Sequence, residues 1–172
     1  MTALPGTRLS AGAYFAKYEQ WLDQIARNHH ARNPREPQRQ AFTPLRRPLA
    51  EARVALVSTA GVHLDDQQPF HVETVAGDPT FRLIPDDIDV TRLRFRHTHY
   101  DTTSAERDPN VVFPLDRLHE AVASGRVGSS SPIHIGLMGF NPDPVPIVEE
   151  TAPAVADVLE DAQADVVALV PG

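Results

Sequence analysis

The chain has 172 residues, which is enough for one ordinary domain with a single buried core. It contains no cysteine, so disulfides, cysteine-ligated zinc and thiol catalysis are excluded within these residues. No apolar run approaches the roughly 20 residues that span a bilayer, and the N-terminus lacks the apolar core of a secretory signal. We therefore expect a cytoplasmic protein that does not use a membrane.

The net charge of −7 is unevenly distributed. Residues 1–50 carry eight Lys and Arg against three acids, whereas residues 51–172 carry eight Arg against 20 acids. An acidic main body repels phosphates, so we expect no nucleic-acid partner. From Asp143 to the end there are seven acids and no Lys or Arg. We interpret them as a solvated helix face, with a docking surface for a basic partner as the alternative.

The first 41 residues are predicted to form a helix and an extended arm. Residues 10–30 place Tyr14, Phe15, Tyr18, Trp21, Leu22 and Ile25 on one helical stripe. Residues 31–50 are rich in proline and arginine, so they are unsuited to helix or sheet. We place a domain boundary between this region, residues 1–41, and an α/β domain over residues 42–172.

The pattern of the second region alternates strands with helices. Expected strands cover residues 53–58, 80–84, 93–97, 133–139 and 165–170, and expected helices cover residues 113–125 and about 151–163. Residues 59–70 are expected to be a loop. This alternation predicts an α/β fold with a mostly parallel sheet and covering helices, incomplete on its C-terminal side.

The densest polar cluster is residues 96–108, "RHTHYDTTSAERD". His97, His99 and Asp101 alternate, so on an extended strand they would share one face and resemble half a metal site. His63 or His71 could supply a further ligand. In the alternative interpretation the imidazoles form a polar strand end bonded to loop carbonyls. They could also bind a substrate carboxylate or move protons, because imidazole titrates near neutral pH.

Other polar residues carry weaker signals. His119 and His134 fall inside an expected helix and strand, so we interpret them as packing or surface residues. The serines of residues 128–134 lack the Gly-x-Ser-x-Gly elbow and precede a strand. The turn-rich loop of residues 139–146 follows a strand and could line a ligand crevice. Glycine-rich phosphate-binding motifs are absent, so no nucleotide site is indicated.

Several longer stretches resemble the selenoprotein B family of glycine, sarcosine, betaine and D-proline reductases, with the selenocysteine-bearing subunit of D-proline reductase as the nearest likeness. They are residues 42–64, 77–85, 99–101, 107–128, 138–140 and 150–172, and they occur in the family's order and at similar spacing. The resemblance covers about three quarters of the chain. His99 stands where a small residue is expected in D-proline reductase, and residues 139–144 differ from that subunit's glycine-rich loop, so the resemblance supports reductase ancestry more than D-proline as substrate.

The resemblance implies reductive cleavage of a C–N bond α to a carboxylate. It implies a pyruvoyl group on a partner subunit, a dithiol reductant, and a selenocysteine or cysteine directly after Gly172. A UGA codon read as a stop would account for an end at that position, and a natural shortening is the alternative. On this view the isolated chain is inactive, and it shapes a pocket for an amino acid or betaine with His63, Arg96, His97, His99 and Asp101.

Two rival interpretations remain at this stage. The chain could be a non-catalytic scaffold subunit, complete at Gly172, that holds a partner through its aromatic helix. Less favoured is a small metal-binding protein built on the His97, His99 and Asp101 cluster. We expect either a partner reductase subunit or a homo-oligomer, and no metal.

Overall fold

The computed structural model describes residues 20, 23, 43–73, 77–97 and 99–172. The chain divides into two units, Met1–Gln40 and Ala41–Gly172. The helix predicted for residues 10–30 and most of the arm lie outside the described residues, so these stay predictions. Within the described part, no helix is long and apolar enough to cross a membrane.

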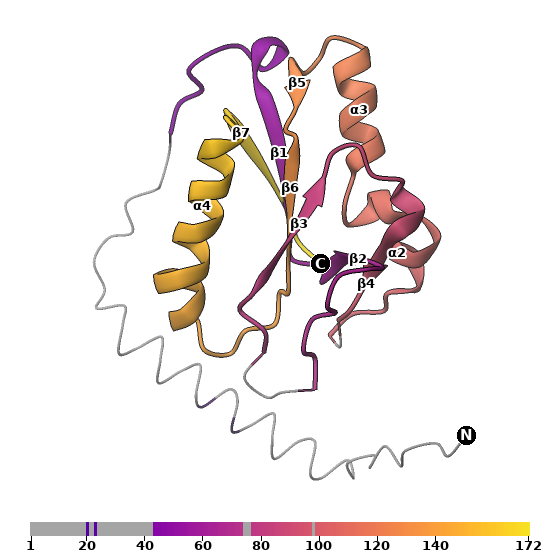
Figure 1. The fold of residues 1–172 in the computed structure, drawn as a ribbon, viewed down its shortest axis with the longest axis vertical. Helices are drawn as coiled ribbons and strands as arrows, with labels where there is room; N and C mark the ends of the chain where they lie inside the picture. Colours follow the sequence, from indigo (N-terminus) through magenta and orange to yellow (C-terminus); the bar gives the residue numbers. More distant parts are fainter. Residues whose placement is uncertain (1–19, 21–22, 24–42, 74–76, 98) are drawn as a thin grey trace. The chain divides into compact units, whose positions relative to one another are not determined.

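β1 (Arg53–Ser58) is the central strand of a mostly parallel sheet (Figure 1). On one side it pairs in parallel with β5 (Ser129–Ser130) and β6 (Ile133–Leu137), which follow each other along the same edge. On the other side it pairs in parallel with β7 (Val166–Val170). β3 (Phe81–Pro85) extends the sheet antiparallel to β6. The α/β class is confirmed, with β3 as the one exception to parallel pairing within this described sheet.

The order of the strands in the sheet reverses at β1, with β6 on one side and β7 on the other. The chain leaves β1 toward β6 on one side, and then crosses through α4 (Ala152–Asp161) to β7 on the other side. In open α/β sheets, ligands bind outside the carboxyl ends of the strands, at the point where the strand order reverses. The topology therefore directs attention to the carboxyl ends of β1, β6 and β7.

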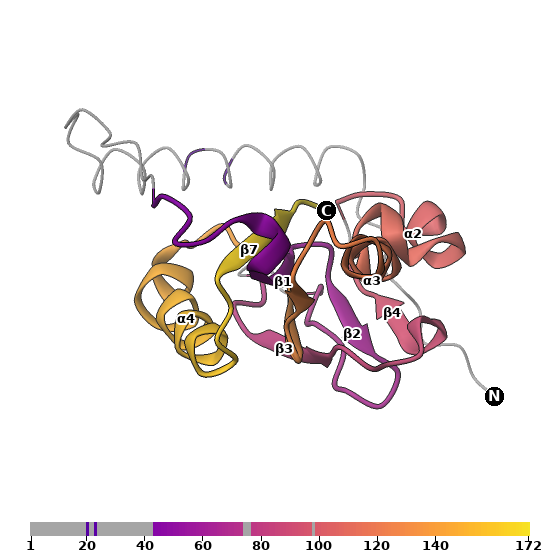
Figure 2. The ribbon, with the colours of Figure 1, turned by 90° about the horizontal axis from the view of Figure 1, so that it is seen from above.

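Helices cover both faces of the sheet (Figure 2). α3 (Leu115–Ala123) packs through Leu115 and Leu118 against Val54 and Leu56 of β1. On the opposite face α4, which continues a π-helical turn over Ile147–Thr151 (η4), packs through Val155 and Leu159. β1 is therefore buried on both faces, as its uninterrupted apolar sequence predicts.

A smaller antiparallel pair lies beside the main sheet. β2 (Val62–Leu64) pairs with β4 (Leu93–Phe95), and the short helix α2 (Thr103–Arg107) follows. The 3-10 turns η1 (Leu49–Glu51), η2 (Val90–Arg92) and η3 (Pro109–Val111) complete the elements of the described part. Residues 59–70 were expected to be a loop, and this was wrong because they contain β2.

The expected strand of residues 93–97 is two residues too long. β4 ends at Phe95, where the Arg96 amide donates to the Gly61 carbonyl over 3.0 Å. The backbone then bends, and the His99 amide donates to Nδ1 of His97 over 3.0 Å. His97, His99 and Asp101 therefore do not alternate along one strand face, and the argument that they share that face was wrong.

One partly buried carboxylate joins four elements. Oδ1 of Asp86, directly after β3, accepts hydrogen bonds from Nε2 of His119 over 2.8 Å, from Nε2 of His134 over 2.9 Å, and from the Ser130 hydroxyl. His134 is fully buried, and its Nδ1 accepts the Leu56 amide over 3.0 Å, so both ring nitrogens are paired. His119 and His134, interpreted from the sequence as packing or surface residues, thus belong to a polar network.

Acidification should weaken the fold through His134. Burial lowers the pKa of His134 below its usual 6.5. Below about pH 6.5 this histidine is therefore protonated in the unfolded chain while it stays neutral in the folded chain. The free energy of unfolding should fall as the pH drops below about 6.5. Urea unfolding between pH 5 and 8 should show this slope, and His134→Gln should reduce it. Burial also lowers the pKa of His63 and His97, so His134→Gln should reduce the slope without abolishing it. An unchanged slope would show that His134 does not cause the loss of stability.

Candidate functional site

The carboxyl ends of the three parallel strands are tied together by their following residues. After β1, the Thr59 amide donates to the Val170 carbonyl, and the Thr59 hydroxyl accepts the Gly172 amide, both over 3.1 Å. The Gly61 amide donates to the Leu137 carbonyl at the end of β6 over 2.8 Å. The turn after β7 is therefore held against the turn after β1, at the place where the topology predicts a crevice.

The segment from His97 to Tyr100 reaches this same edge. The Tyr100 hydroxyl donates to the Ala60 carbonyl over 2.9 Å. The His99 ring stacks on Phe140, in the loop after β6, with centroids 3.8 Å apart and an interplanar angle of 18°. The Gly172 backbone also packs closely against Ala60, because a Cβ added to Gly172 would lie 2.3 Å from the Ala60 Cα. Tyr100 and Gly172 thus converge on one residue of β1's exit loop.

His97 presents an unpaired polar atom at this edge. Its Nδ1 accepts the His99 amide, so its other nitrogen, Nε2, carries the proton in the neutral ring. Nε2 is buried and has no hydrogen-bond partner among the described residues. Burial, and secondarily the nearby His99, lowers the pKa of His97. The ring is therefore a neutral donor that needs an acceptor, and a buried donor left unpaired costs about 1–3 kcal/mol.

Asn141 presents the complementary case in the loop after β6. Its amide nitrogen donates to the Met138 carbonyl over 2.6 Å. Its Oδ1 is buried and has no hydrogen-bond partner in the described part of the chain. This loop was expected to line a ligand crevice, but Asn141 was not among the predicted site residues. The Gly77 backbone lies against this oxygen, since a Cβ added to Gly77 would be 2.8 Å from the Asn141 Oδ1. The burial of the acceptor therefore depends on a tertiary contact, which the sequence does not reveal.

His63 and Arg96 lie in a different environment. Together with Arg94, Phe70 and others they line an open cavity of about 610 Å³. Nδ1 of His63 lies 3.1 Å from the Gly61 carbonyl, and burial together with the arginines lowers its pKa. Arg96 forms an ion pair of 3.1 Å with the exposed Glu73. The Gly61 carbonyl therefore connects this cavity with the segment that carries His97.

The Asp101 carboxylate is hydrogen-bonded to the first residue of α2. Its Oδ1 accepts the Thr103 hydroxyl over 2.6 Å and the Thr103 amide over 3.0 Å, at the start of α2. These hydrogen bonds lower the pKa of its exposed carboxyl. Among the residues that the structure describes, no three His, Cys, Asp or Glu are grouped so that they could hold a metal ion. The geometry therefore gives the metal interpretation of His97, His99 and Asp101 no support.

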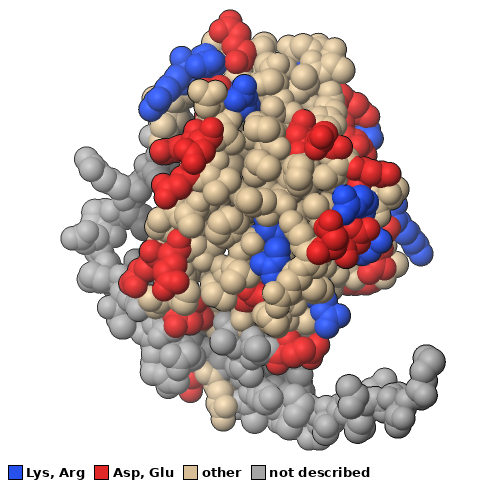
Figure 3. All heavy atoms as spheres, viewed as in Figure 1, with Lys and Arg blue, Asp and Glu red and all other residues tan. Residues whose placement is uncertain are grey.

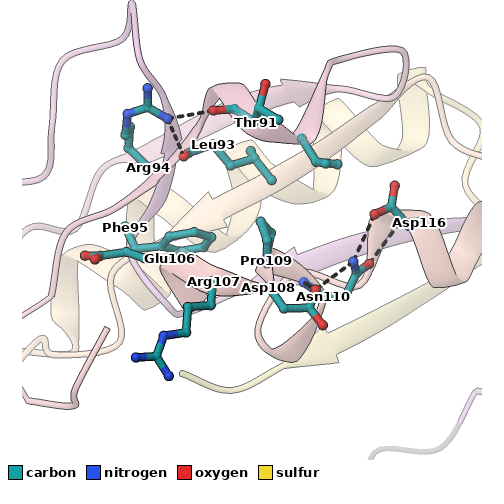
Figure 4. A pocket seen from close by; sticks show the side chains of 11 residues that line it. Thr91, Leu93, Arg94, Phe95, Glu106, Arg107, Asp108, Pro109, Asn110 and Asp116 are labelled. Atoms are coloured by element: carbon teal, nitrogen blue, oxygen red, sulfur yellow. Dashed lines mark hydrogen bonds between the residues drawn. The ribbon is translucent and has the colours of Figure 1, made fainter. Parts of the chain in front are cut away.

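A further cavity of about 630 Å³ lies between β4, α2 and η3 (Figure 4). Several of its polar side chains are already hydrogen-bonded within the chain. The Asn110 amide donates to both Asp108 and Asp116 over 2.9 Å, and Arg94 donates to the Thr91 and Leu93 carbonyls over 2.8 Å. We assign no ligand to it.

Comparison with known proteins agrees with the resemblance noted in the sequence. Residues 34–171 match the model of the family described as glycine/sarcosine/betaine reductase selenoprotein B. Over 131 residues the chain is 36% identical to the D-proline reductase subunit gamma of Acetoanaerobium sticklandii. That match covers 76% of this chain but 53% of the relative, so the chain spans about half the relative's length. No solved structure matches the chain.

Proposed function

The chain belongs to the glycine/sarcosine/betaine reductase selenoprotein B family, and from this premise we propose that it forms the substrate-side part of an amino-acid or betaine reductase subunit. The reaction is the reductive cleavage of a C–N bond α to a carboxylate. The C–N bond breaks and a C–H bond forms at the α-carbon. A dithiol supplies two electrons and two protons and becomes a disulfide, with one proton going to the α-carbon and the other to the leaving amine. A pyruvoyl group on a partner subunit belongs to the same proposal, and none of the described residues is assigned to it.

The observation that carries the proposal is the unpaired Nε2–H of His97 at the carboxyl ends of the parallel strands. A substrate carboxylate is an acceptor of the right chemistry for a buried neutral donor, because a hydrogen bond to a charged group contributes about 1.5–3 kcal/mol. The carboxylate is shared by all substrates of the family's reaction. His97 would therefore read the common feature of these substrates rather than distinguish among them.

Discrimination between substrates is assigned to the loop after β6. The Asn141 Oδ1 would accept from a substrate N–H, which a primary or secondary amine offers and a quaternary ammonium lacks. The His99 ring, stacked on Phe140, would narrow the pocket at the position where the resemblance leads us to expect a small residue. These contacts favour a small amine-bearing substrate over a betaine.

Arg96 is proposed as an auxiliary carboxylate clamp. Its partner Glu73 has 84% of its side chain exposed, and exposed ion pairs contribute about 0–1 kcal/mol. Such a pair can be exchanged for a substrate carboxylate at little cost. His63 stays a proposed pocket residue through the cavity it shares with Arg96, whereas the Asp101 carboxylate, occupied by Thr103, is the least favoured of the pocket residues.

Substrate binding can be tested without turnover. The chain is titrated with glycine, D-proline and betaine while the imidazole resonances are followed by NMR. We expect His97 to shift with all three ligands, and His97→Phe to abolish binding. Asn141→Leu should weaken the binding of glycine and D-proline but leave that of betaine unchanged.

His119 offers the control. It is a half-exposed histidine on α3 that donates to Asp86, and it does not line the cavity of His63 and Arg96. His119→Gln, which keeps a donor for Asp86, should bind the three ligands as the unmodified chain does. Saturable binding that persists in His97→Phe would contradict the proposed site. Equal loss in both variants would show that the effect is not specific to His97.

A further inference from the structure

The sheet has an open edge at β7. Among the described strands, β7 pairs only with β1, so its other edge carries backbone groups without a strand partner. Its sequence is entirely apolar, yet Leu169 is 76% exposed and Val167 is 38% exposed. An uninterrupted apolar strand is expected to be buried on both faces. The exposure of these two side chains therefore marks a surface that the rest of the described fold does not cover.

The two exposed side chains border a groove. A cavity of about 360 Å³ runs between α4 and β7, and no charged side chain lines it. Its walls are Val155 and Leu159 of α4 and Val167 and Leu169 of β7, over Val57 of β1. The unpaired strand edge and the apolar groove are thus adjacent, and one structural unit can cover both if it supplies a strand together with a helix.

The charges around the groove restrict what can occupy it. Residues 143–172 carry seven acids and no Lys or Arg, and acidic side chains lie over the α4 side of the molecule (Figure 3). Two copies that met through this surface would bring acids against acids, which is unfavourable. The groove therefore suits an apolar stripe with basic flanks better than a second copy of the same surface.

The length of the relative indicates where such a unit comes from. The match leaves 47% of the D-proline reductase gamma subunit uncovered. We propose that the β7 edge and the groove form the interface for the polypeptide that corresponds to this uncovered part. That polypeptide adds a strand parallel to β7 and lays the apolar face of its adjoining helix into the groove. The inference concerns assembly and stands independently of the substrate residues proposed above.

The interface can be tested by coexpression. The 172-residue chain is produced together with the part of the Acetoanaerobium sticklandii gamma subunit that lies outside the match. We expect a 1:1 complex, with hydrogen exchange at the Val167 and Leu169 amides slowed relative to the chain alone. Leu169→Arg should weaken the complex by about 30-fold or more, as for a central interface residue.

Val111→Arg is the matched control, because Val111 is 54% exposed and lies on η3, outside the groove. This variant should bind within about twofold of the unmodified chain, since surface substitutions away from an interface have small effects. Failure to form a complex, or equal weakening by both variants, would overturn the proposal. A homodimer of the chain that Leu169→Arg dissociates would also overturn it, and would assign the surface to a second copy. None of these readouts depends on His97, so this proposal and the proposed function can fail separately.

Discussion

Gly61→Ala should destabilise the protein by about 3–5 kcal/mol, which is among the largest effects of single substitutions. Gly61 has a φ of 71°, a conformation that costs a residue with a Cβ about 1–2 kcal/mol. A Cβ there would also lie 2.1 Å from the Arg96 carbonyl oxygen. Backbone cannot move aside as a flexible side chain can, so β4 and the His97 segment must shift.

Gly125→Ala separates the two causes. Gly125 has a nearly identical φ of 70°, but a Cβ at this position meets nothing within 4 Å. We expect this control to lose about 1–2 kcal/mol. Urea unfolding of the two variants gives the difference directly. Equal losses would show that the approach of Arg96 to Gly61 is looser than the structure describes. A folded Gly61→Ala should also have lost the ligand-induced shift of His97.

A chalcogen directly after Gly172 should decide whether the assembled enzyme turns over. In the proposed reaction a selenolate or thiolate attacks the α-carbon, and the 172 residues contain no cysteine that could replace it. The Thr59 hydroxyl holds the Gly172 amide, and Tyr100, whose ring contacts His97, donates to the neighbouring Ala60 carbonyl. A residue added after Gly172 would therefore emerge at this edge. We therefore expect the 172-residue chain, combined with pyruvoyl-bearing partner subunits and dithiothreitol, to give only background cleavage.

The comparison uses two extended chains, each continued past Gly172 with sequence from the part of the gamma subunit that lies outside the match. One carries cysteine at the first added position and the other carries serine, which has nearly the same shape but a far weaker nucleophile. The cysteine form should release the deaminated acid from glycine or D-proline, measured by chromatography, and the serine form should not. Turnover by the serine form would refute the assignment of the nucleophile to this position.

Long elements with strong periodicity could be predicted from the sequence. The apolar run of β1, the amphipathic spacing of α3 and α4, and the valine-rich β7 each carry a local signal that the structure confirms. Short elements could not. The three residues of β2 become a strand only because β4 pairs with them some 30 residues later. Likewise, α2 buries only Ala105, so its sequence has no apolar stripe from which a helix could be predicted.

The site shows the same limit. Sequence reasoning selected His97 and His99 because histidines are chemically conspicuous, and both lie at the carboxyl edge of the sheet. It grouped Asp101 with them by assuming an extended strand, but β4 ends at Phe95 and the His99 amide turns back to donate to His97. Asn141 was missed because an asparagine in a proline-rich turn normally serves the turn. Its significance comes from a buried, unpaired oxygen, which only tertiary structure creates.

The shared oxygen of Asp86 has a consequence for how such chains diverge. His119, Ser130 and His134 all donate to that atom, from α3, β5 and β6. Replacing Asp86 alone strands three donors, and replacing His134 alone strands the Leu56 amide as well. Neither change is tolerated readily by itself, whereas a joint replacement that also keeps an acceptor for the Leu56 amide leaves no buried member of the set unpaired. Across the family these four positions should therefore covary, with homologues either keeping the whole set or exchanging it together.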